Sequence, residues 1–207
     1  MKQPTIGIVD YGAGNLTSVK QSLRNMGYRS RVSSDREVLD QTDLLLLPGV
    51  GAFPAAMKSL HSSRLAEYLI NKVHQGAPLI GICLGMQLLV DYSHEIKKTP
   101  GLGLIPGEVM PLSQTDWHIG WNNIEMLNQN TMTSGNDGLA VYFNHSHVVK
   151  TDSEFNIGLS RIDQSSEPFT IAIRRNNVVG LQFHPEKSQQ AGRKILTSVV
   201  EGLLTEY

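Results

Sequence analysis

The one cysteine of the chain, Cys83, lies between two glycines in the stretch Gly81-Ile-Cys83-Leu-Gly85, directly after an apolar run. Apolar residues at helical spacing follow it. This pattern predicts a sharp turn from a strand into a helix, which pushes one side chain out of the backbone. A thiol there lies at a helix N-terminus, where free N–H groups and the helix dipole favour the thiolate. A lone cysteine is more often a small core residue, but the glycine frame indicates a nucleophile.

A histidine and a carboxylate near the other end of the chain fit the needs of such a nucleophile. They stand in His184-Pro-Glu186, at the end of an apolar run. A cysteine nucleophile needs a base that takes the thiol proton and later protonates the leaving group, and the base needs an acceptor that holds its tautomer. A spacing of two residues on extended chain aims both side chains into one site. Without Cys83, the same residues would be interpreted as a solvated turn.

A third segment, Pro48-Gly49-Val50-Gly51, follows the run 43–47, which reads Asp-Leu-Leu-Leu-Leu. Acyl transfer needs N–H donors for the oxyanion of its tetrahedral intermediate. The glycines on both sides of Val50 allow the peptide planes to turn their N–H groups inward. As an isolated motif this is an ordinary turn, but beside a nucleophile it indicates an oxyanion-binding loop.

Two further motifs are rejected as sites. Gly12-Ala-Gly14 begins like a dinucleotide fingerprint, but Thr17 stands where the third small residue belongs, and no acidic residue ends the following strand. His145-Ser-His147 has no cysteine or carboxylate neighbour that would complete a metal site.

The elements that must position these groups alternate between strand and helix over the first 92 residues. We expect strands at 5–10, 29–33, 43–47 and 78–82, and helices at 15–26 (capped by Asn15), at 55–75 and directly after Cys83. Such alternation predicts a parallel sheet covered on both faces, with its site at the carboxyl ends of the strands. Short β-type runs at 103–109, 119–124, 140–143, 147–149, 169–174 and 178–182 predict largely antiparallel additions to this sheet, and a closing helix is expected at 189–204.

Composition narrows the class of protein. The 207 residues are 40% hydrophobic and 18% charged with a net charge of −1, which is ordinary for one globular domain and gives no nucleic-acid or membrane-surface footprint. A single cysteine makes no internal disulfide. No signal segment or membrane-spanning run is visible, so a cytoplasmic protein is expected.

Together these residues resemble the class I (triad) glutamine amidotransferase family. The likeness rests on the cysteine turn with Gln87 behind it, on the Pro-Gly-Val-Gly loop and on His184-Pro-Glu186, in the order of the family. Within the family the chain is similar to the glutaminase subunits of histidine biosynthesis, through residues 10–16, through Gly49-Val50-Gly51 where many relatives have Gly-Gly, and through residues 118–122 and 184–189. The resemblance spans nearly the full length. It implies one α/β amidotransferase domain over residues 1–207, with a mostly parallel central sheet, flanking helices and antiparallel strands in the C-terminal half.

The resemblance also implies a reaction. Cys83 would attack the carboxamide carbon of L-glutamine, with His184 and Glu186 completing the triad. The N–H groups of Val50 and Leu84 would hold the oxyanion, and no cofactor or metal would take part. The residues implied to hold glutamine are Gly49, Gly51, Gln87, Asn144, Ser146 and His147. The subunits it resembles commonly have valine where Asn144 stands and tyrosine where His147 stands.

A partner is implied as well. Ammonia would pass to a separate (β/α)₈-barrel cyclase subunit in a heterodimer, because a dry passage keeps it from becoming ammonium. Asn15, Trp121 and Lys187 are expected on the surface that faces this partner; their plain structural interpretations are a helix cap, a buried aromatic and a solvated lysine. Trp117 and Trp121 are expected in an exposed loop, where they would pack on the core or anchor a protein partner.

Two other classes of function stay open at this point. A stand-alone cysteine hydrolase, such as a γ-glutamyl hydrolase, or an amidotransferase with another acceptor would use the same triad. The chain has no room for an acceptor domain, which favours a partner in a separate chain. A non-enzymatic binding module would need neither Cys83 nor His184.

Overall fold

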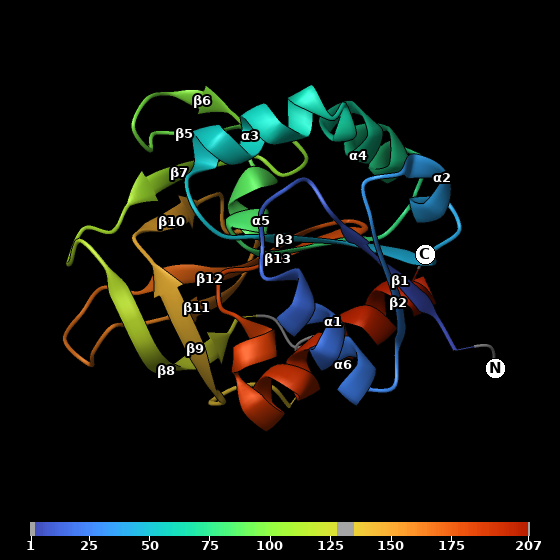
Figure 1. Ribbon diagram of the computed structural model, residues 1–207. Coiled ribbons are helices and arrows are strands. Elements are labelled where there is room, and N and C mark those ends of the chain that lie inside the picture. Colours follow the sequence, from blue (N-terminus) through green and yellow to red (C-terminus); the bar gives the residue numbers. More distant parts are fainter. Residues whose placement is uncertain (1–2, 128–134, 207) are drawn as a thin grey trace.

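A nine-stranded sheet forms the centre of the molecule in the computed structural model, which describes residues 3–127 and 135–206 (Figure 1). Its strands lie in the order β2 (Arg29–Ser33), β1 (Thr5–Val9), β3 (Leu44–Gly49), β4 (Leu79–Cys83), β13 (Val178–Leu181), β12 (Phe169–Arg175), β11 (Asn156–Ser160), β8 (His118–Met126) and β9 (Ala140–His145). The strands from β2 to β13 pair in parallel, and those from β12 to β9 are antiparallel. The expected parallel sheet with antiparallel additions is therefore confirmed.

Helices cover both faces of this sheet, as Figure 1 shows. They are α1 (Leu16–Asn25), α2 (Arg36–Leu39), α3 (Phe53–Ser62), α4 (Leu65–His74), α5 (Leu84–Leu88) and α6 (Gln189–Glu206), with a 3-10 turn η1 (Pro185–Lys187). Helices α1 and α6 bury apolar stripes in one core cluster, and α3, α4 and α5 bury theirs in another on the opposite face. Two apolar faces on one parallel sheet require helices on both sides.

The N-terminal half follows the sequence closely. Strands β1, β2 and β4 lie within one residue of their expected bounds. Helix α1 begins after Asn15, whose Oδ1 accepts a hydrogen bond from Ser18 N at 3.3 Å, and Gly27 follows its end with a φ of +86°. A side-chain cap at the start and a left-handed glycine at the end are what the sequence predicted.

Two expected boundaries in this half are wrong. The strand expected at 43–47 continues through Pro48 and Gly49, because these residues pair with Ile82 and Cys83. The single helix expected at 55–75 is two helices, α3 and α4, separated at Arg64, whose φ is +56°. A left-handed residue cannot continue a right-handed helix.

The C-terminal half departs further, because some of its strands do not join the main sheet. A separate four-stranded sheet has the order β10 (His147–Lys150), β7 (Glu108–Pro111), β5 (Tyr92–Ser93) and β6 (Thr99–Pro100). Strands β5, β6 and β11 and helix α2 were not expected from the sequence. Trp121 lies on β8 and not in a loop.

The strand expected at 103–109 is wrong over most of its length. Its N–H groups instead satisfy carbonyls at the end of α5: Leu102 N donates to Leu88 O and Leu104 N to Leu89 O, both at 2.8 Å. The orphan carbonyls of a helix end need partners, and this segment supplies them.

The topology brings three distant segments to one edge of the sheet. The carboxyl ends of β3, β4 and β13 lie side by side, with Gly49 paired to Cys83 and Leu181 to Ile82. The end of β9 adds residues 144–147 to the same place. This edge is where an open α/β sheet places its site.

Gly85 is a sharp test of this arrangement. A β-carbon at this position would lie 1.9 Å from the carbonyl oxygen of Leu47, which belongs to strand backbone and cannot give way. We expect Gly85→Ala to lower the free energy of unfolding by about 2–3 kcal/mol, measured by urea titration. Gly158→Ala is the matched control, since its new methyl would approach most closely the side-chain end of Ile171, at 2.9 Å, which can shift, and should cost less. Equal losses for the two variants would contradict the close approach of α5 to β3.

Candidate active site

Cys83 stands at the junction of β4 and α5 with φ +55° and ψ −114°, a strained conformation for a residue with a side chain. The turn is tight because three glycines leave room for it. A β-carbon at Gly81 would lie 2.6 Å from Gly85 O, and one at Gly49 would lie 2.7 Å from Gly85 N. The sharp strand-to-helix turn expected from the glycine frame is therefore present.

His184 and Glu186 meet beside this cysteine. His184 Nδ1 lies 2.8 Å from Glu186 Oε1, and both side chains are buried. The loop that carries them is fastened to β9 at both ends. His184 N donates to Tyr142 O, and Ser188 Oγ, which accepts from Tyr142 N, donates to His184 O. The imidazole is thus held in place by backbone as well as by the carboxylate.

The electrostatics of His184 depend on its two neighbours. Burial by itself lowers the pKa of His184, but hydrogen bonding and charge from Cys83 and Glu186 outweigh it and raise that pKa to about 9. The second carboxylate oxygen, Glu186 Oε2, is buried and has no hydrogen-bond partner among the residues that the structure describes. Burial and the charge of Cys83 raise the pKa of Tyr11, whose hydroxyl donates to Pro48 O at 2.9 Å. Tyr11 therefore stays a neutral donor under the loop.

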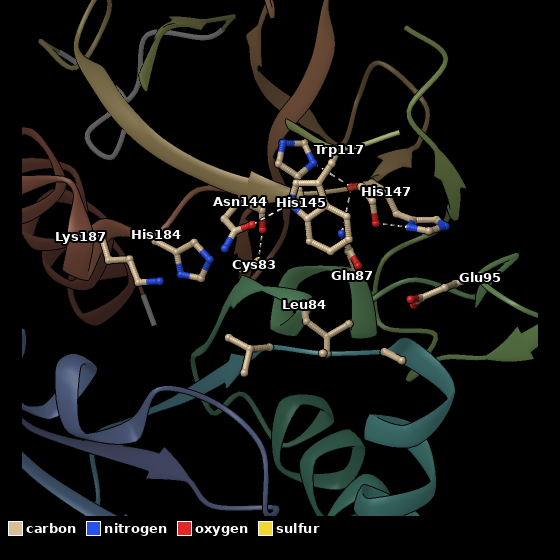
Figure 2. Close-up of a pocket in the computed structure, with 14 residues that line it drawn as sticks. Cys83, Leu84, Gln87, Glu95, Trp117, Asn144, His145, His147, His184 and Lys187 are labelled. Carbon is tan, nitrogen blue, oxygen red and sulfur yellow. Dashed lines mark hydrogen bonds between the residues drawn. The ribbon is translucent and has the colours of Figure 1, made fainter. Parts of the chain in front are cut away.

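A cavity of about 370 Å³ opens over Cys83 (Figure 2). It is lined by Val50, Gly51, Ala52, Cys83, Leu84, Gln87, Glu95, Trp117, Asn144, His145, Ser146, His147, His184 and Lys187. Most residues expected to hold the substrate or the oxyanion are in this set. Gly49 is not a lining residue, because it is buried in β3, and Glu186 lies behind His184.

The segment 144–147 forms one wall and is held by the side chain of Gln87. Gln87 Nε2 donates to His147 O and to Gln182 Oε1, both at 3.0 Å. Both N–H groups of Gln87 are used in this way, so its Oε1 is the group left to accept from a ligand. Cys83 Sγ lies 3.9 Å from Asn144 O on the same wall, as the dashed lines in Figure 2 show.

The side chains of Asn144 and His147 have partners within the protein. Asn144 Oδ1 accepts from Trp117 Nε1 at 2.8 Å, and His147 Nδ1 lies 2.9 Å from Ser146 Oγ. Trp117 lies at the mouth of the cavity and is 55% exposed. Both side chains therefore shape the wall of the cavity, whatever contact they make with a ligand.

Sequence reasoning missed several groups of this site. Glu95 accepts from Phe53 N at 2.7 Å and so fixes the start of α3 beside the cavity; nothing in its loop sequence marks it. His145 was considered only as a metal ligand, and it instead faces His118 at 3.1 Å and the carbonyl of His147 at 2.9 Å. Burial lowers the pKa of His145 to about 4. The sequence did carry a signal for Gln182. It stands two residues before His184 on extended chain, and this spacing places both side chains on the same side of the strand.

The three residues expected to face a partner lie in different settings. Asn15 caps α1, Trp121 is 48% exposed on β8, and Lys187 lines the cavity with its Nζ 5.7 Å from the ring centre of Tyr142. Trp121 is not the buried aromatic of the plain interpretation. Ile119 lies two residues before it on β8, on the same face of the strand, and is 63% exposed.

The chemistry of the cavity is that of acyl transfer by a thiol. It combines a strained cysteine at a helix start, a histidine–carboxylate pair and a glycine-flanked loop. Across residues 3–127 and 135–206, no group of three or more histidine, cysteine or acidic side chains is placed to hold a metal ion. No helix in that part of the chain is long and apolar enough to span a membrane.

Curated relatives match the chain over nearly its whole length. The "Imidazole glycerol phosphate synthase subunit HisH" of Shouchella clausii is 41% identical over 95% of this chain and 99% of its own length. The subunit of the same name from Lactococcus lactis is 39% identical over 95% and 98%, and that of Aquifex aeolicus is 42% identical over 91% and 92%.

Solved structures share the fold at lower identity. The chain of a PurLQS structure from Thermotoga maritima superposes with a TM-score of 0.75 at 19% identity, over 98% of this chain and all of that one. A glutamine amidotransferase structure from the same organism gives 0.69 at 15% identity, over 99% of each chain. The family model "Glutamine amidotransferase class-I" matches residues 7–200, which include all three groups of the cysteine–histidine–glutamate site. The chain belongs to the class I glutamine amidotransferase family.

Proposed function

We propose that this protein is the glutaminase subunit of imidazole glycerol phosphate synthase. One observation carries the proposal: Cys83 and the His184–Glu186 pair, 101 and 103 residues apart in sequence, meet at one cavity. The curated relatives, near 40% identity over almost their full length, are named as subunits of imidazole glycerol phosphate synthase, and the matching family model is that of class I glutamine amidotransferases. As in the expectation from the sequence, the whole chain, 1–207, is proposed as one amidotransferase domain that acts in the cytoplasm.

The proposed reaction proceeds in two steps. The thiolate of Cys83 forms a C–S bond with the carboxamide carbon of L-glutamine, and the carbonyl oxygen takes the negative charge. When this intermediate collapses, the C–N bond breaks and the nitrogen takes a proton from His184 and leaves as ammonia. Water then gives a proton to His184 and attacks the glutamyl thioester, the C–S bond breaks, and glutamate leaves. Glu186 keeps the imidazole in the orientation that both steps need.

The oxyanion is proposed to be held by the backbone N–H groups of Val50 and Leu84. Leu84 begins α5, so its N–H has no acceptor within the helix. Val50 is 43% exposed at the mouth of the cavity. The next residue, Gly51, has a φ of +98°, and a β-carbon there would contact nothing within 4 Å. The peptide between them therefore has space to turn.

The substrate is proposed to lie between the loop 49–51 and the wall 144–147. Gln87 Oε1 is suited to accept from the α-ammonium group of glutamine, because its amide nitrogen is engaged elsewhere. Ser146 and the backbone of the wall provide further polar contacts. Asn144 Oδ1 and His147 Nδ1 are bonded to Trp117 and Ser146. We therefore propose that these two side chains shape the wall of the substrate site.

The proposed partner is a (β/α)₈-barrel cyclase that receives ammonia and forms imidazole glycerol phosphate and an aminoimidazole carboxamide ribotide. Exposed apolar side chains at and near the cavity support an interface: Val50 and Trp117 line the cavity, and Ile119 and Trp121 are exposed on β8, which begins directly after Trp117. A water-excluding contact there would keep ammonia unprotonated on its way to the acceptor. Asn15, Trp121 and Lys187 are the residues we assign to this surface.

Replacing the nucleophile gives the first test. Cys83→Ser should lower glutamine-dependent synthesis by at least about 1000-fold, because the hydroxyl is a far poorer nucleophile than the thiolate. Glutamate release and product formation with the cyclase measure it. Added ammonium salt should still support synthesis by the cyclase, and co-elution of the variant with the cyclase checks that the fold and the partner contact persist. Appreciable glutaminase activity in this variant would rule out Cys83 as the nucleophile.

The open space around the peptide between Val50 and Gly51 gives a second test. The isolated chain should hydrolyse glutamine slowly, and adding the cyclase with its own ligand should raise the rate by about 5- to 150-fold, the usual range of allosteric coupling. Steady-state glutamate release with and without the cyclase measures this. Fast hydrolysis by the isolated chain, unchanged by the partner, would favour a stand-alone hydrolase. Labelled nitrogen from glutamine in the cyclised product separates ammonia transfer from simple hydrolysis.

The raised pKa of His184 gives a third test. A base whose pKa rises from its ordinary 6.5 to about 9 on folding stabilises the folded state fully below pH 6.5, and this contribution is lost as the pH rises through 9. The free energy of unfolding, measured with urea between pH 6.5 and 9.5, should therefore fall in that window. His184→Gln should remove this part of the pH dependence. The pKa of the buried His145 is lowered to about 4, so this residue changes the pH dependence of unfolding only below pH 6.5, outside the measured window. An identical slope in both proteins would contradict the assignment.

A further inference from the structure

Gln182 is a buried polar side chain that contacts the proposed nucleophile directly. It follows the end of β13 and is 0% exposed. Its Nε2 lies 3.8 Å from Cys83 Sγ, within hydrogen-bond range for sulfur, and its Oε1 lies 3.0 Å from Gln87 Nε2. A buried amide is costly unless its groups are paired, so both ends of this side chain are accounted for by the site.

The hydrogen-bond pattern fixes which end of the amide faces the sulfur. The carbonyl of His147 can only accept, so Gln87 must turn its nitrogen toward it. The same nitrogen lies against Gln182, which must therefore present its oxygen. The nitrogen of Gln182 is left facing Cys83 Sγ and donates to it. The carbonyl of His147 on the wall 144–147 thus fixes, through Gln87, the orientation of the Gln182 amide, so the assignment of its nitrogen and oxygen is not arbitrary.

We propose that Gln182 is a further catalytic residue, which donates a hydrogen bond to the sulfur of Cys83 whenever that sulfur carries negative charge. This inference rests on the proposed role of Cys83 as nucleophile. Negative charge stands on the sulfur twice in the reaction: in the thiolate before attack, and when the C–S bond of the thioester breaks during hydrolysis. A hydrogen bond from a neutral donor to a charged acceptor is stronger than one between neutral groups.

The position of Gln182 suits this task better than a purely structural one. It reaches the sulfur from β13, whereas α5 supports Cys83 from its own helix start. Gln87 joins it to the wall 144–147, so the donor and the substrate-binding backbone share one hydrogen-bond network. Displacing the wall would therefore also displace the donor.

The test is the alkylation of the only cysteine of the chain. The rate of reaction with iodoacetamide, followed from pH 5 to pH 10, reports the thiolate fraction and needs neither glutamine nor the cyclase. Gln182→Met keeps the volume of the side chain and removes the donor. We expect the midpoint of the alkylation profile to rise by about one pH unit, and kcat for glutamine hydrolysis to fall by about 10-fold with KM within about twofold.

Asn177→Leu is the matched control. Asn177 is also a buried amide, at the other end of β13, and its Nδ2 donates to Val73 O and Ala77 O, away from the cavity. This variant loses buried hydrogen bonds in the same way and should destabilise the fold, but its alkylation profile should match that of the unaltered protein. A shift of similar size in both variants, or no shift in Gln182→Met, would overturn the proposal.

A second measurement covers the case in which Gln182→Met does not fold. In the unaltered protein, the side-chain amide resonances of Gln182 should move at the same pH at which the Cβ resonance of Cys83 reports ionisation. Amide resonances that do not respond to that ionisation would overturn the inference. Because neither readout involves glutamine, a protein that shows the shift but does not hydrolyse glutamine would refute the proposed function and leave the Gln182–Cys83 contact standing.

Discussion

The close approach of two backbone segments, at Gly49 of β3 and Gly85 of α5, is the constraint on which the rest of the site depends. Atoms of the two segments lie so near that a single added methyl group at either glycine would overlap backbone atoms of the other segment. This contact places the loop 49–51 beside the start of α5, and Val50 and Leu84 both line the cavity together with Cys83. It also forces Cys83 into its strained left-handed conformation, which directs the thiol into the cavity.

A hydrogen-bond network, in which donors and acceptors are fixed, connects the backbone around Cys83 to the substrate wall 144–147. It runs from His145 through the carbonyl of His147 to Gln87, and through Gln182 to the sulfur. The carbonyl of His147 cannot donate, so it fixes Nδ1 of His145 and Nε2 of Gln87 as donors, and the orientation of Gln182 follows from that of Gln87. Since His145 ends β9, His147 begins β10 and Gln87 lies on α5, the network ties the antiparallel strands to the nucleophile at the end of β4. Such buried networks hold their members rigidly when every group is paired.

The opposite side of the cavity is built differently. Val50 and Trp117 line it and are exposed, Ile119 and Trp121 are exposed on the neighbouring strand β8, and Gly51 borders open space. The nucleophile and its base are thus rigid, while the loop proposed to bind the oxyanion has freedom to move. This division suits a glutaminase whose activity waits for a partner, because covering the rim would both exclude water and restrict the loop.

The sequence by itself determined the local features of this protein. These features follow from short-range sterics and periodicity, which can be recognised in one sequence. They are the glycine frame around Cys83, the spacing of His184 and Glu186, the cap at Asn15, and the alternation of strands and helices in the first half. Only the tertiary structure decided the division of the C-terminal strands into two sheets, the break at Arg64 and the partners of Gln182, Glu95 and His145. These depend on which backbone groups and side chains from distant segments satisfy one another after packing, and hydrophobic pattern carries no information on that choice.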